Sequence, residues 1–432
     1  MSNRMLIDAR HPEETRVAVI NGQRIEEFDF EAADKRQLKG NIYLAKVTRV
    51  EPSLQAAFVE YGGNRHGFLA FSEIHPDYYQ IPKEDRDALL REEAELAADD
   101  HGHDGEEGDE SDDVLETGGH HDEPSDALRR KRMALRRRYK IQEVIRRRQV
   151  MLIQVVKEER GSKGAALTTY LSLAGRYCVL MPNTARGGGI SRKITVATDR
   201  KKLKEIASEL EVPEGAGLII RTAGAKRTKP EINRDYEYLM RLWEQIRELT
   251  LKSMAPAAIY EEGDLIKRSI RDLYSREIDE ILVEGEAGYR TAKDFMKMIM
   301  PSHAKVVQRH NDQMPLFARY QVESYLAGMF NPTVQLKSGG YIVIGVTEAL
   351  VAIDVNSGRA TKEGSIEDTA LKTNLEAAEE IARQLRLRDL AGLIVIDVID
   401  MEERKNNAAV EKRLKDKLKT DRARIQVGRI SG

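Results

Sequence analysis

Two short apolar runs near the end of the chain each lead directly into an acidic residue. Leu350–Ile353 precedes Asp354, and Asn356 follows two residues later. Leu393–Ile396 precedes Asp397 in the same way. Both runs are predicted to be strands that carry an aspartate at or near the carboxyl end.

The segment between these runs, Ser365–Leu387, has apolar residues at helical spacing and predicts one amphipathic helix. Ser365 with Asp368 three residues later resembles a capping box, which supports a helix start at this point. Strand, helix and strand in this order predict a parallel βαβ unit. Because the strands are almost continuously apolar, they are expected to be buried on both faces.

In parallel sheets, functional sites form beyond the carboxyl ends of the strands, so Asp354 and Asp397 are expected to lie side by side if their strands are neighbours. Two adjacent buried carboxylates repel each other, and a divalent cation relieves that repulsion. Mg²⁺ is the natural candidate because it takes one or two carboxylates and keeps several waters. The alternative is that Asp354 is a turn residue and Asp397 a capping residue, and spacing alone leaves both interpretations open.

Apolar and polar residues alternate over Gly40–Phe71, which predicts the strands of a small β-barrel, and Val150–Val156 is expected to complete it. Phe58 and Phe68 stand among basic residues in this segment. Exposed aromatic rings interleaved with basic residues suit single-stranded nucleic acid. The alternative, that both rings fill the barrel core, is the more frequent arrangement for isolated aromatic residues in strands.

The remaining pattern alternates strand and helix signals and predicts an α/β protein. Strands are expected at Met5–Ile7, Thr15–Ile20, Gln23–Glu27 and Gly217–Thr222, a hairpin at Gln335–Val346, and helices at Asp199–Leu210, Asn233–Leu249, Asp264–Leu273, Thr291–Met300, Tyr320–Phe330 and Asn407–Leu418. Arg221 and Thr222 end one of these strands. A guanidinium fork beside a hydroxyl suits a terminal phosphate, although the same tetrapeptide, with the two residues after Thr222, also fits a turn with a surface arginine.

With 432 residues the chain is long enough for several domains, and its formal net charge of −2 conceals strongly acidic and basic segments. Its single cysteine, Cys178, excludes an intrachain disulfide and a multi-cysteine zinc site, and suits a reducing compartment. No apolar run is long enough to cross a bilayer, and the N-terminal residues do not resemble a signal peptide. We therefore expect a soluble, cytoplasmic protein.

A charged insertion interrupts the barrel segment between about Asp77 and Arg148. Glu92–Asp126 is acidic without lysine or arginine, so it is expected to be disordered. Arg129–Arg148 is strongly basic. It is interpreted either as an arm that contacts RNA or as a solvated stretch that pairs with its acidic neighbour, and that neighbour's competition with phosphate favours the second.

Basic residues also follow the last barrel strand. Lys157, Arg160 and Lys163 alternate with glycines that let the backbone approach a ligand closely, which suits phosphate or a nucleic-acid backbone. A glycine run that ends near Arg192 predicts a second phosphate-contacting loop, although such a run is a weak signal.

Several long segments together resemble the catalytic half of the ribonuclease E/G family of endoribonucleases. They are NIYLAKVTRVEPSLQAAFVEYGGNRHGFL, KEERGSKGAALTTYLSLAGRYCVLMPN, GLIIRTAG, EALVAIDVNSGRAT, TNLEAAEEIARQLRLRDLAGLIVIDVIDM and DRARIQV. The resemblance covers most of the chain outside residues 77–148, and it implies a multidomain α/β fold. The implied parts are an RNase H-like domain (1–38 and 266–332), an inserted OB-fold RNA-binding domain (39–170), a 5′-sensor region (171–265) and a DNase I-like catalytic subdomain (333–432).

The resemblance also assigns residues to roles. It implies that Asp354 and Asp397 bind magnesium and that Asn356 orients the scissile phosphate or the attacking water. For the remaining site residues it implies a 5′-monophosphate grip at Arg221, Thr222, Gly175 and Val179, and RNA contacts at Phe58, Phe68, Lys157, Arg160, Lys163, Arg192 and Arg424. The family assignment favours the RNA-platform interpretation of the two phenylalanines over the core interpretation.

The implied activity is magnesium-dependent cleavage of single-stranded, AU-rich RNA with a preference for 5′-monophosphorylated ends, in mRNA decay and in rRNA and tRNA processing. The implied partners are RNA, further copies of the chain in a tetramer, and degradosome proteins, in the cytoplasm or associated with the inner face of the membrane. The family also joins protomers through Zn²⁺ at a Cys-Pro-x-Cys motif, which is absent up to Gly432, and Cys178 does not replace it. Zinc-linked assembly is therefore not expected of this polypeptide.

Two alternatives remain at this point. The insertion favours the ribonuclease E branch of the family over a ribonuclease G-type enzyme. A different class of function is an RNA-binding fragment with little activity, because the oligomerising region is missing from the sequence.

Overall fold

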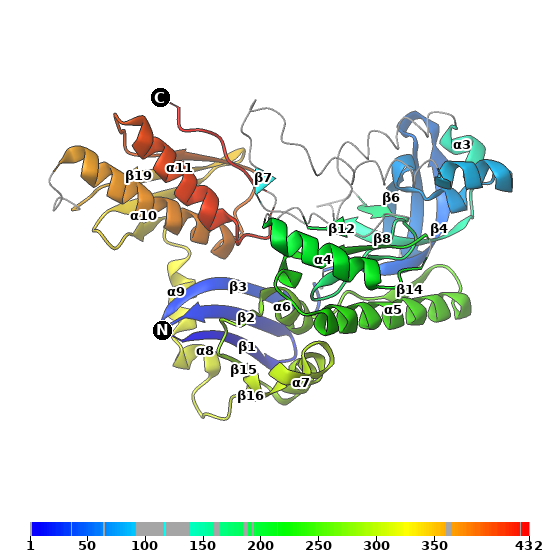
Figure 1. Ribbon diagram of the computed structural model, residues 1–432, viewed down its shortest axis with the longest axis horizontal. Helices are drawn as coiled ribbons and strands as arrows, with labels where there is room; N and C mark the ends of the chain where they lie inside the picture. Colours follow the sequence, from blue (N-terminus) through cyan, green and yellow to red (C-terminus); the bar gives the residue numbers. More distant parts are fainter. Residues whose placement is uncertain are drawn as a thin grey trace.

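The computed structural model describes residues 2–35, 37–63, 65–91, 116–117, 139–158, 164–184, 189–191, 194, 196–213, 215–359, 365–423 and 425–431. It is a mixed α/β protein in which a five-stranded sheet lies below a β-barrel and a second, helix-covered sheet (Figure 1). Long segments of the chain separate strands that pair in space, so the sequence order and the spatial order of the parts differ.

The five-stranded sheet combines the N-terminus with the middle of the chain. Its order is β16-β15-β1-β2-β3, formed by Val307–Arg309, Glu280–Glu284, Asn3–His11, Glu14–Asn21 and Arg24–Ala32. β1, β2 and β3 form an antiparallel meander, whereas β15 and β16 run parallel to β1. Helix α7 (Glu286–Ile299) lies between β15 and β16 in the chain, and α8 (Leu316–Arg319) and α9 (Val322–Gly328) follow β16. The strands expected from the N-terminal pattern are confirmed.

The second unit is a closed five-stranded barrel. Its strands are β4 (Ile42–Glu51), β5 (Ala56–Gly62), β6 (Arg65–Ala70), β9 (Ala165–Thr168) and β8 (Val150–Lys157), and pairing of β4 with β8 closes it. β6 and β9 pair in parallel and the other barrel neighbours are antiparallel. The expectation that the strand after the insertion completes the barrel is confirmed.

The insertion was expected to extend from about residue 77 to residue 148, and this range is too wide at both ends. Residues 83–91 are helical, and Tyr79 and Leu89 are buried in the barrel core. On the other side, Ile141 and Val144 of α3 (Ile141–Val144) belong to the same core. The apolar residues in these flanks supply enough buried surface to order them. The acidic stretch from 92 and the basic stretch to 138 lie outside the described residues, apart from β7 (Glu116–Thr117), which pairs with β21 (Ile425–Gln426).

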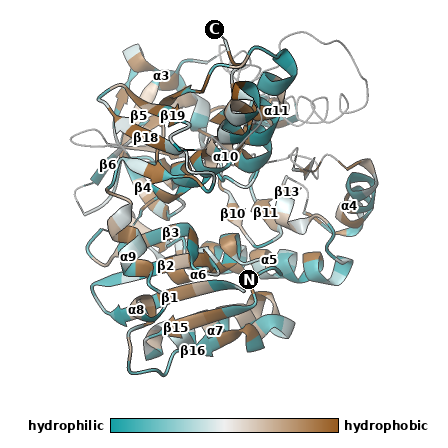
Figure 2. Ribbon diagram, turned by 90° about the vertical axis from the view of Figure 1, so that its left-hand side faces the viewer, coloured by the Kyte–Doolittle hydropathy of each residue, from teal (hydrophilic) through white to brown (hydrophobic). Residues whose placement is uncertain are grey.

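A small four-stranded sheet links the barrel to the five-stranded sheet. Its order is β10-β11-β13-β12, formed by Leu173–Ala174, Cys178–Met181, Gly217–Ile220 and Gly189–Ile190. Helix α4 (Ala197–Glu209) lies between β12 and β13 in the chain, and the long α5 (Lys229–Lys252) and α6 (Leu265–Leu273) follow β13. Between these two helices, β14 (Ala257–Tyr260) pairs with β4. Figure 2 shows the apolar residues of β1 and β15 inside the molecule and polar residues over the outer helices.

The C-terminal unit is a four-stranded sheet with helices on one face. Its order is β17-β18-β19-β20, formed by Thr333–Gln335, Tyr341–Val346, Leu350–Asn356 and Leu393–Asp397, and α10 (Ile366–Leu387) and α11 (Arg404–Leu418) are its helices. The predicted βαβ unit is confirmed, because β19 and β20 pair in parallel. The Ser365 hydroxyl accepts the Asp368 backbone N–H at 3.0 Å, so the predicted helix start is confirmed as well.

The expectation that these strands are buried on both faces is wrong. Burial alternates along β19, and on β20 Leu393 and Val395 are 61% and 48% exposed. Val351, Ile353 and Val355 point to the other face and pack in the core with α10. Because the described helices cover only one face, apolar residues that look equivalent in sequence differ in environment.

Helix α10 also fastens this unit to the five-stranded sheet. Glu380 is 7% exposed, pairs with Arg24 of β3, and accepts a 2.5 Å bond from Arg383. Arg383 also donates at 2.5 Å to the carbonyl of Ile25. The polar side of α10, outside its apolar stripe, therefore contacts β3 of the five-stranded sheet. No helix in the described part of the chain is long and apolar enough to cross a membrane.

Candidate active site

Asp354 and Asp397 lie side by side on neighbouring strands. In the parallel pairing of β19 with β20 they are register partners, as are Ala352 and Val395 two residues earlier. Side chains of register partners project to the same face of a sheet. Both aspartates are exposed on the face that the helices leave open. The two carboxylates therefore form one acidic pair at the carboxyl end of the parallel strands.

Asn356 lies on the same face because it follows Asp354 by two residues in a strand. Its Nδ2 donates to Asp354 Oδ2 at 2.8 Å. This bond orients both side chains. The side-chain carbonyl oxygen of Asn356 and the second carboxylate oxygen of Asp354 remain available to accept hydrogen bonds or to bind a cation.

The acidic pair has the donor chemistry of a site for a hard divalent cation. Within the described part of the chain, no lysine, arginine or histidine forms an ion pair with Asp354 or Asp397. Two carboxylates without a protein cation fit Mg²⁺, which takes one or two carboxylates and fills its other positions with water and phosphate. Among the described residues there is also no cluster of three or more His, Cys, Asp or Glu side chains that would hold a metal ion by themselves.

A second polar site lies at the end of β13. Arg221 donates through Nη1 to the Gly175 carbonyl at 2.6 Å and to Asp272 Oδ1 at 2.9 Å. Thr222 begins the short helix Thr222–Gly224 and is exposed, and its hydroxyl lies 3.1 Å from the Ser191 hydroxyl. The structure thus brings a guanidinium and two hydroxyls to one edge of the small sheet.

The turn before β11 supports this site from below. Asp235 is 4% exposed and accepts the backbone N–H groups of Arg176, Tyr177 and Cys178 at 2.9, 2.7 and 2.8 Å. Burial raises the pKa of Asp235, while these three hydrogen bonds lower it. Gly175 is held against this carboxylate, since a Cβ there would lie 2.5 Å from Asp235 Oδ2. Only glycine fits.

The two aromatic residues of the barrel are register partners on β5 and β6. Phe58 and Phe68 are half-buried, their ring centroids lie 6.0 Å apart, and neither belongs to the barrel core. The guanidinium of Arg49 on β4 lies over the Phe58 ring, 4.7 Å from its centroid. The alternative that these rings fill the core is therefore wrong. The three side chains form a partly exposed aromatic and cationic surface, which we call the barrel platform (Arg49, Phe58 and Phe68).

Comparison with known proteins adds an independent observation. The model of the ribonuclease E/G family matches residues 172–432. Ribonuclease E of Haemophilus influenzae is 45% identical over 428 residues, and ribonuclease E of Escherichia coli K12 is 44% identical over 429. Ribonuclease G of Escherichia coli K12 is 33% identical over 420 residues, which are 97% of this chain and 76% of that protein. The chain belongs to the ribonuclease E/G family.

The two ribonuclease E relatives are much longer than this chain. Each match covers 99% of the chain but only 40% of the Haemophilus protein and 36% of the Escherichia protein. A putative ribonuclease E of Buchnera aphidicola (subspecies Baizongia pistaciae) has a more similar length, with 39% identity over 99% of this chain and 92% of that protein. The matches to these relatives thus extend over the acidic pair, the β13 site and the barrel platform, whereas the family model includes the first two only.

Several residues that the resemblance to the ribonuclease E/G family singles out do not form part of a described contact. Arg160, Lys163, Arg192 and Arg424 lie outside the described residues. Lys157 is exposed at the end of β8. Val179 is 1% exposed in β11, so its side chain packs in the core beneath the β13 site. Cys178 is fully buried, and burial raises the pKa of its thiol, which does not suit a metal ligand.

Three further residues of these sites were not found by sequence reasoning. Ser191 and Asp272 contact Thr222 and Arg221, and Arg49 lies over Phe58. Arg49 is one of several basic residues in the barrel strands, and nothing in the sequence distinguishes it from the others. Arg49 lies opposite Phe58 on the neighbouring strand, but this pairing can be recognised only when the strand register is known. Ser191 and Asp272 carry no local signal, because 31 and 51 residues separate them from their partners.

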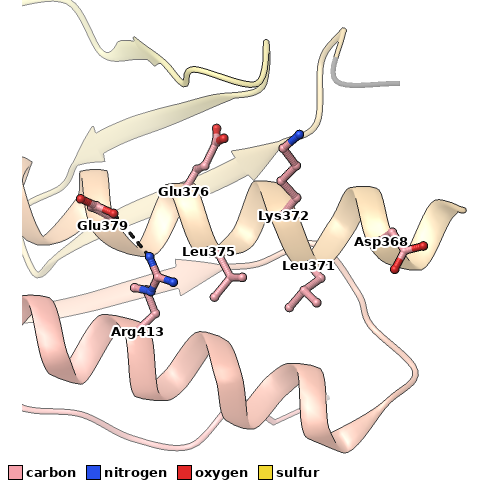
Figure 3. Close-up of a pocket in the computed structure, with 7 residues that line it drawn as sticks. All are labelled: Asp368, Leu371, Lys372, Leu375, Glu376, Glu379 and Arg413. Carbon is pink, nitrogen blue, oxygen red and sulfur yellow. Dashed lines mark ion pairs between the residues drawn. The ribbon is translucent and has the colours of Figure 1, made fainter. Parts of the chain in front are cut away.

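A groove between α10 and α11 lies on the helix-covered side of the C-terminal four-stranded sheet (Figure 3). Leu371 and Leu375 line it together with the ion pair of Glu379 and Arg413. Its lining includes no residue of the acidic pair, the β13 site or the barrel platform. It is therefore separate from the candidate active site.

Proposed function

We propose that this protein is a magnesium-dependent endoribonuclease that cleaves single-stranded RNA. The observation that carries the proposal is the pairing of Asp354 with Asp397 in register on an exposed sheet edge, with Asn356 bonded to Asp354. The family to which the chain belongs supports an endoribonuclease of RNA processing and decay. From the resemblance to this family we further infer a cytoplasmic role in mRNA decay and in the processing of rRNA and tRNA.

Asp354 and Asp397 would hold Mg²⁺, and neither has a competing cation among the described side chains. A bound Mg²⁺ lowers the pKa of a coordinated water and neutralises charge on the phosphate. Asn356 donates its amide to Asp354 and has its carbonyl oxygen free to accept a hydrogen bond from the attacking water. Because water attacks instead of the ribose 2′-hydroxyl, the products should carry 5′-phosphate and 3′-hydroxyl ends.

The barrel and the β13 site would hold the substrate. We infer that the barrel is an OB-fold and that Phe58 and Phe68 stack bases of single-stranded RNA, with Arg49 and the exposed Lys157 beside the backbone. Arg221 and Thr222 would grip a 5′-monophosphate. Unstructured, AU-rich segments suit this arrangement, because their bases are available for stacking.

The proposal is tested with a 5′-monophosphorylated, AU-rich oligonucleotide and the full chain, with and without Mg²⁺. Asp354→Asn and Asp397→Asn should each lower the cleavage rate by about a hundredfold or more, while RNA affinity stays within about threefold. Glu348→Gln is the matched control, because Glu348 is an exposed carboxylate before the other end of β19. Cleavage that persists without a divalent cation, or products with 2′,3′-cyclic phosphates, would refute the mechanism.

A further inference from the structure

Only one end of the Arg221 guanidinium is hydrogen-bonded to the described part of the protein. Its Nη1 atom makes both hydrogen bonds, one to the Gly175 carbonyl and one to Asp272 Oδ1. Among the described residues, no acceptor binds Nε or Nη2. Since a guanidinium has five N–H groups in a fixed plane, fixing one end also fixes the direction of the other. The side chain is 17% exposed, so its free N–H groups have access to a ligand.

Asp272 is itself held so that its carboxylate cannot turn away. It is the second-last residue of α6, and its side chain is 9% exposed. Oδ1 accepts from Arg221 at 2.9 Å and from Arg271 Nε at 3.1 Å, and Oδ2 accepts from Arg271 Nη2 at 2.9 Å. Burial opposes ionisation of Asp272, but Arg271 and Arg221 hold its pKa well below the usual range. Asp272 is therefore an anion at neutral pH.

Arg271 continues this chain of contacts to the barrel. It pairs with Glu262, whose backbone N–H donates to Asn41 Oδ1 at 2.8 Å, and Asn41 lies directly before β4. A Cβ at Gly40 would lie 3.0 Å from the Glu262 side chain, so the barrel backbone packs closely on the same group. These buried ion pairs therefore connect Arg221 to the barrel and fix its position relative to the barrel.

The same contacts balance the charge around the site. The cations Arg221 and Arg271 are matched by the anions Asp272 and Glu262. Among the described residues the two charges of each sign are equal in number, and a phosphate that enters gains binding energy from directed N–H groups.

We propose that Asp272 is a positioning residue for recognition of the RNA 5′ end. Its carboxylate holds Nη1 of Arg221, so that the other N–H groups of the guanidinium stay directed at a terminal monophosphate. This inference rests on the proposed function, in which Arg221 and Thr222 bind that phosphate. Asp272 does not touch the RNA in this arrangement.

The test compares one single-stranded oligonucleotide with either a 5′-monophosphate or a 5′-hydroxyl end. The measured quantity is the ratio of kcat/KM for the two ends, because the 5′-hydroxyl substrate corrects for changes in folding or in the catalytic step. Asp272→Asn keeps the shape of the side chain but turns N–H groups toward Arg221 or Arg271. The ratio should fall at least about fivefold, through KM, and Arg221→Ala should lower it further. Glu277→Gln, an exposed carboxylate just after α6, is the matched control and should keep the ratio.

The double variant separates positioning from general damage. If Asp272 acts through Arg221, adding Asp272→Asn to Arg221→Ala lowers the ratio no further. If the two effects multiply, or if Asp272→Asn alone leaves the ratio unchanged while Arg221→Ala lowers it, the inference is overturned and the phosphate grip stands. If Arg221→Ala leaves the ratio unchanged, the phosphate grip itself fails.

Arg221→Lys gives a second test that does not alter Asp272. The lysine keeps the charge, but its single nitrogen would be held by Asp272 and the Gly175 carbonyl, leaving no separate edge for phosphate. We expect Arg221→Lys to lower the ratio of the two kcat/KM values as much as Arg221→Ala does. A lysine variant that keeps the ratio within about twofold of the parent would show that the divided guanidinium is not needed.

Discussion

Adding one methyl group at Gly175 should disturb the phosphate site from below. In Gly175→Ala the new Cβ would lie 2.5 Å from Asp235 Oδ2 and 2.9 Å from its Cγ. The φ angle of Gly175 is outside the left-handed region, so an alanine costs no backbone strain there. The whole effect should therefore come from the collision with Asp235.

Asp235 cannot move aside cheaply. It is 4% exposed and accepts three backbone N–H groups at 2.7 to 2.9 Å. A shift large enough to restore normal contact distance would break or lengthen about two of these bonds, each worth about 1.5 kcal/mol or more to a charged acceptor. The expected loss of local stability is about 3 kcal/mol, which is about a hundredfold in an equilibrium constant.

Native-state hydrogen exchange is the suitable assay, because a multidomain chain does not unfold in a single transition. The amides of Arg176, Tyr177 and Cys178 should lose about a hundredfold in protection in Gly175→Ala. Gly328→Ala is the control, because a Cβ there meets no atom within 4 Å and the backbone is not in the left-handed region. Since the Gly175 carbonyl accepts Arg221 Nη1, the preference for a 5′-monophosphate should fall as well.

Two results would refute this reasoning. The first is protection of the three amides that stays within about threefold of the parent. The second comes from a double variant: with Asp235→Ala in place, the methyl group at 175 meets no carboxylate and should cost less than about 0.5 kcal/mol. If Gly175→Ala costs the same in both backgrounds, the collision is not the cause.

Three further predictions concern the other parts of the molecule. Phe58→Ala should weaken the binding of single-stranded RNA by about 1–3 kcal/mol in fluorescence anisotropy, because the half-buried ring can stack on a base. Phe330→Ala, at a 90% exposed ring away from the barrel, is the control. Equal RNA affinities of Phe58→Ala and the parent would contradict the barrel platform. Glu380→Gln removes the acidic partner of the mostly buried Arg383 and one of the two acidic partners of Arg24, so it should destabilise the docking of α10 on β3 by about 3 kcal/mol. Peptides of α10 that exchange at the parent rate would disprove the interface. Asp272 is buried, yet Arg271 and Arg221 lower its pKa below the unfolded value, so its pairing stabilises the protein above about pH 4 and is lost as the pH falls. The urea midpoint should therefore drop more steeply between about pH 5 and pH 3 in the parent than in Asp272→Asn, and parallel curves would exclude this contribution.

The sequence by itself determined the local structure and the chemical type of the catalytic edge. The apolar runs before Asp354 and Asp397, the helix that begins at Ser365 and the alternating barrel strands appear in the structure close to where the pattern places them. These features depend on residues within a few positions of one another, so a single sequence contains the information. The family resemblance rested on the same local segments.

Only the tertiary structure decided which face of the C-terminal sheet is open. An apolar residue on β19 or β20 looks the same in sequence whether it packs against α10, as Ile353 does, or faces solvent, as Val395 does. The ordered flanks of the insertion were missed for a related reason, because their apolar residues gain burial only against a barrel core formed by distant segments.

The contacts that orient the phosphate site also came from the tertiary structure alone. Asp272 meets Arg221 across 51 residues, and Glu262 reaches Asn41 across 221. No spacing rule connects such positions, because the path between them is set by how α6 packs beside two sheets. Sequence therefore supplied Arg221 as a candidate, and the fold supplied the carboxylate that fixes the direction of its guanidinium.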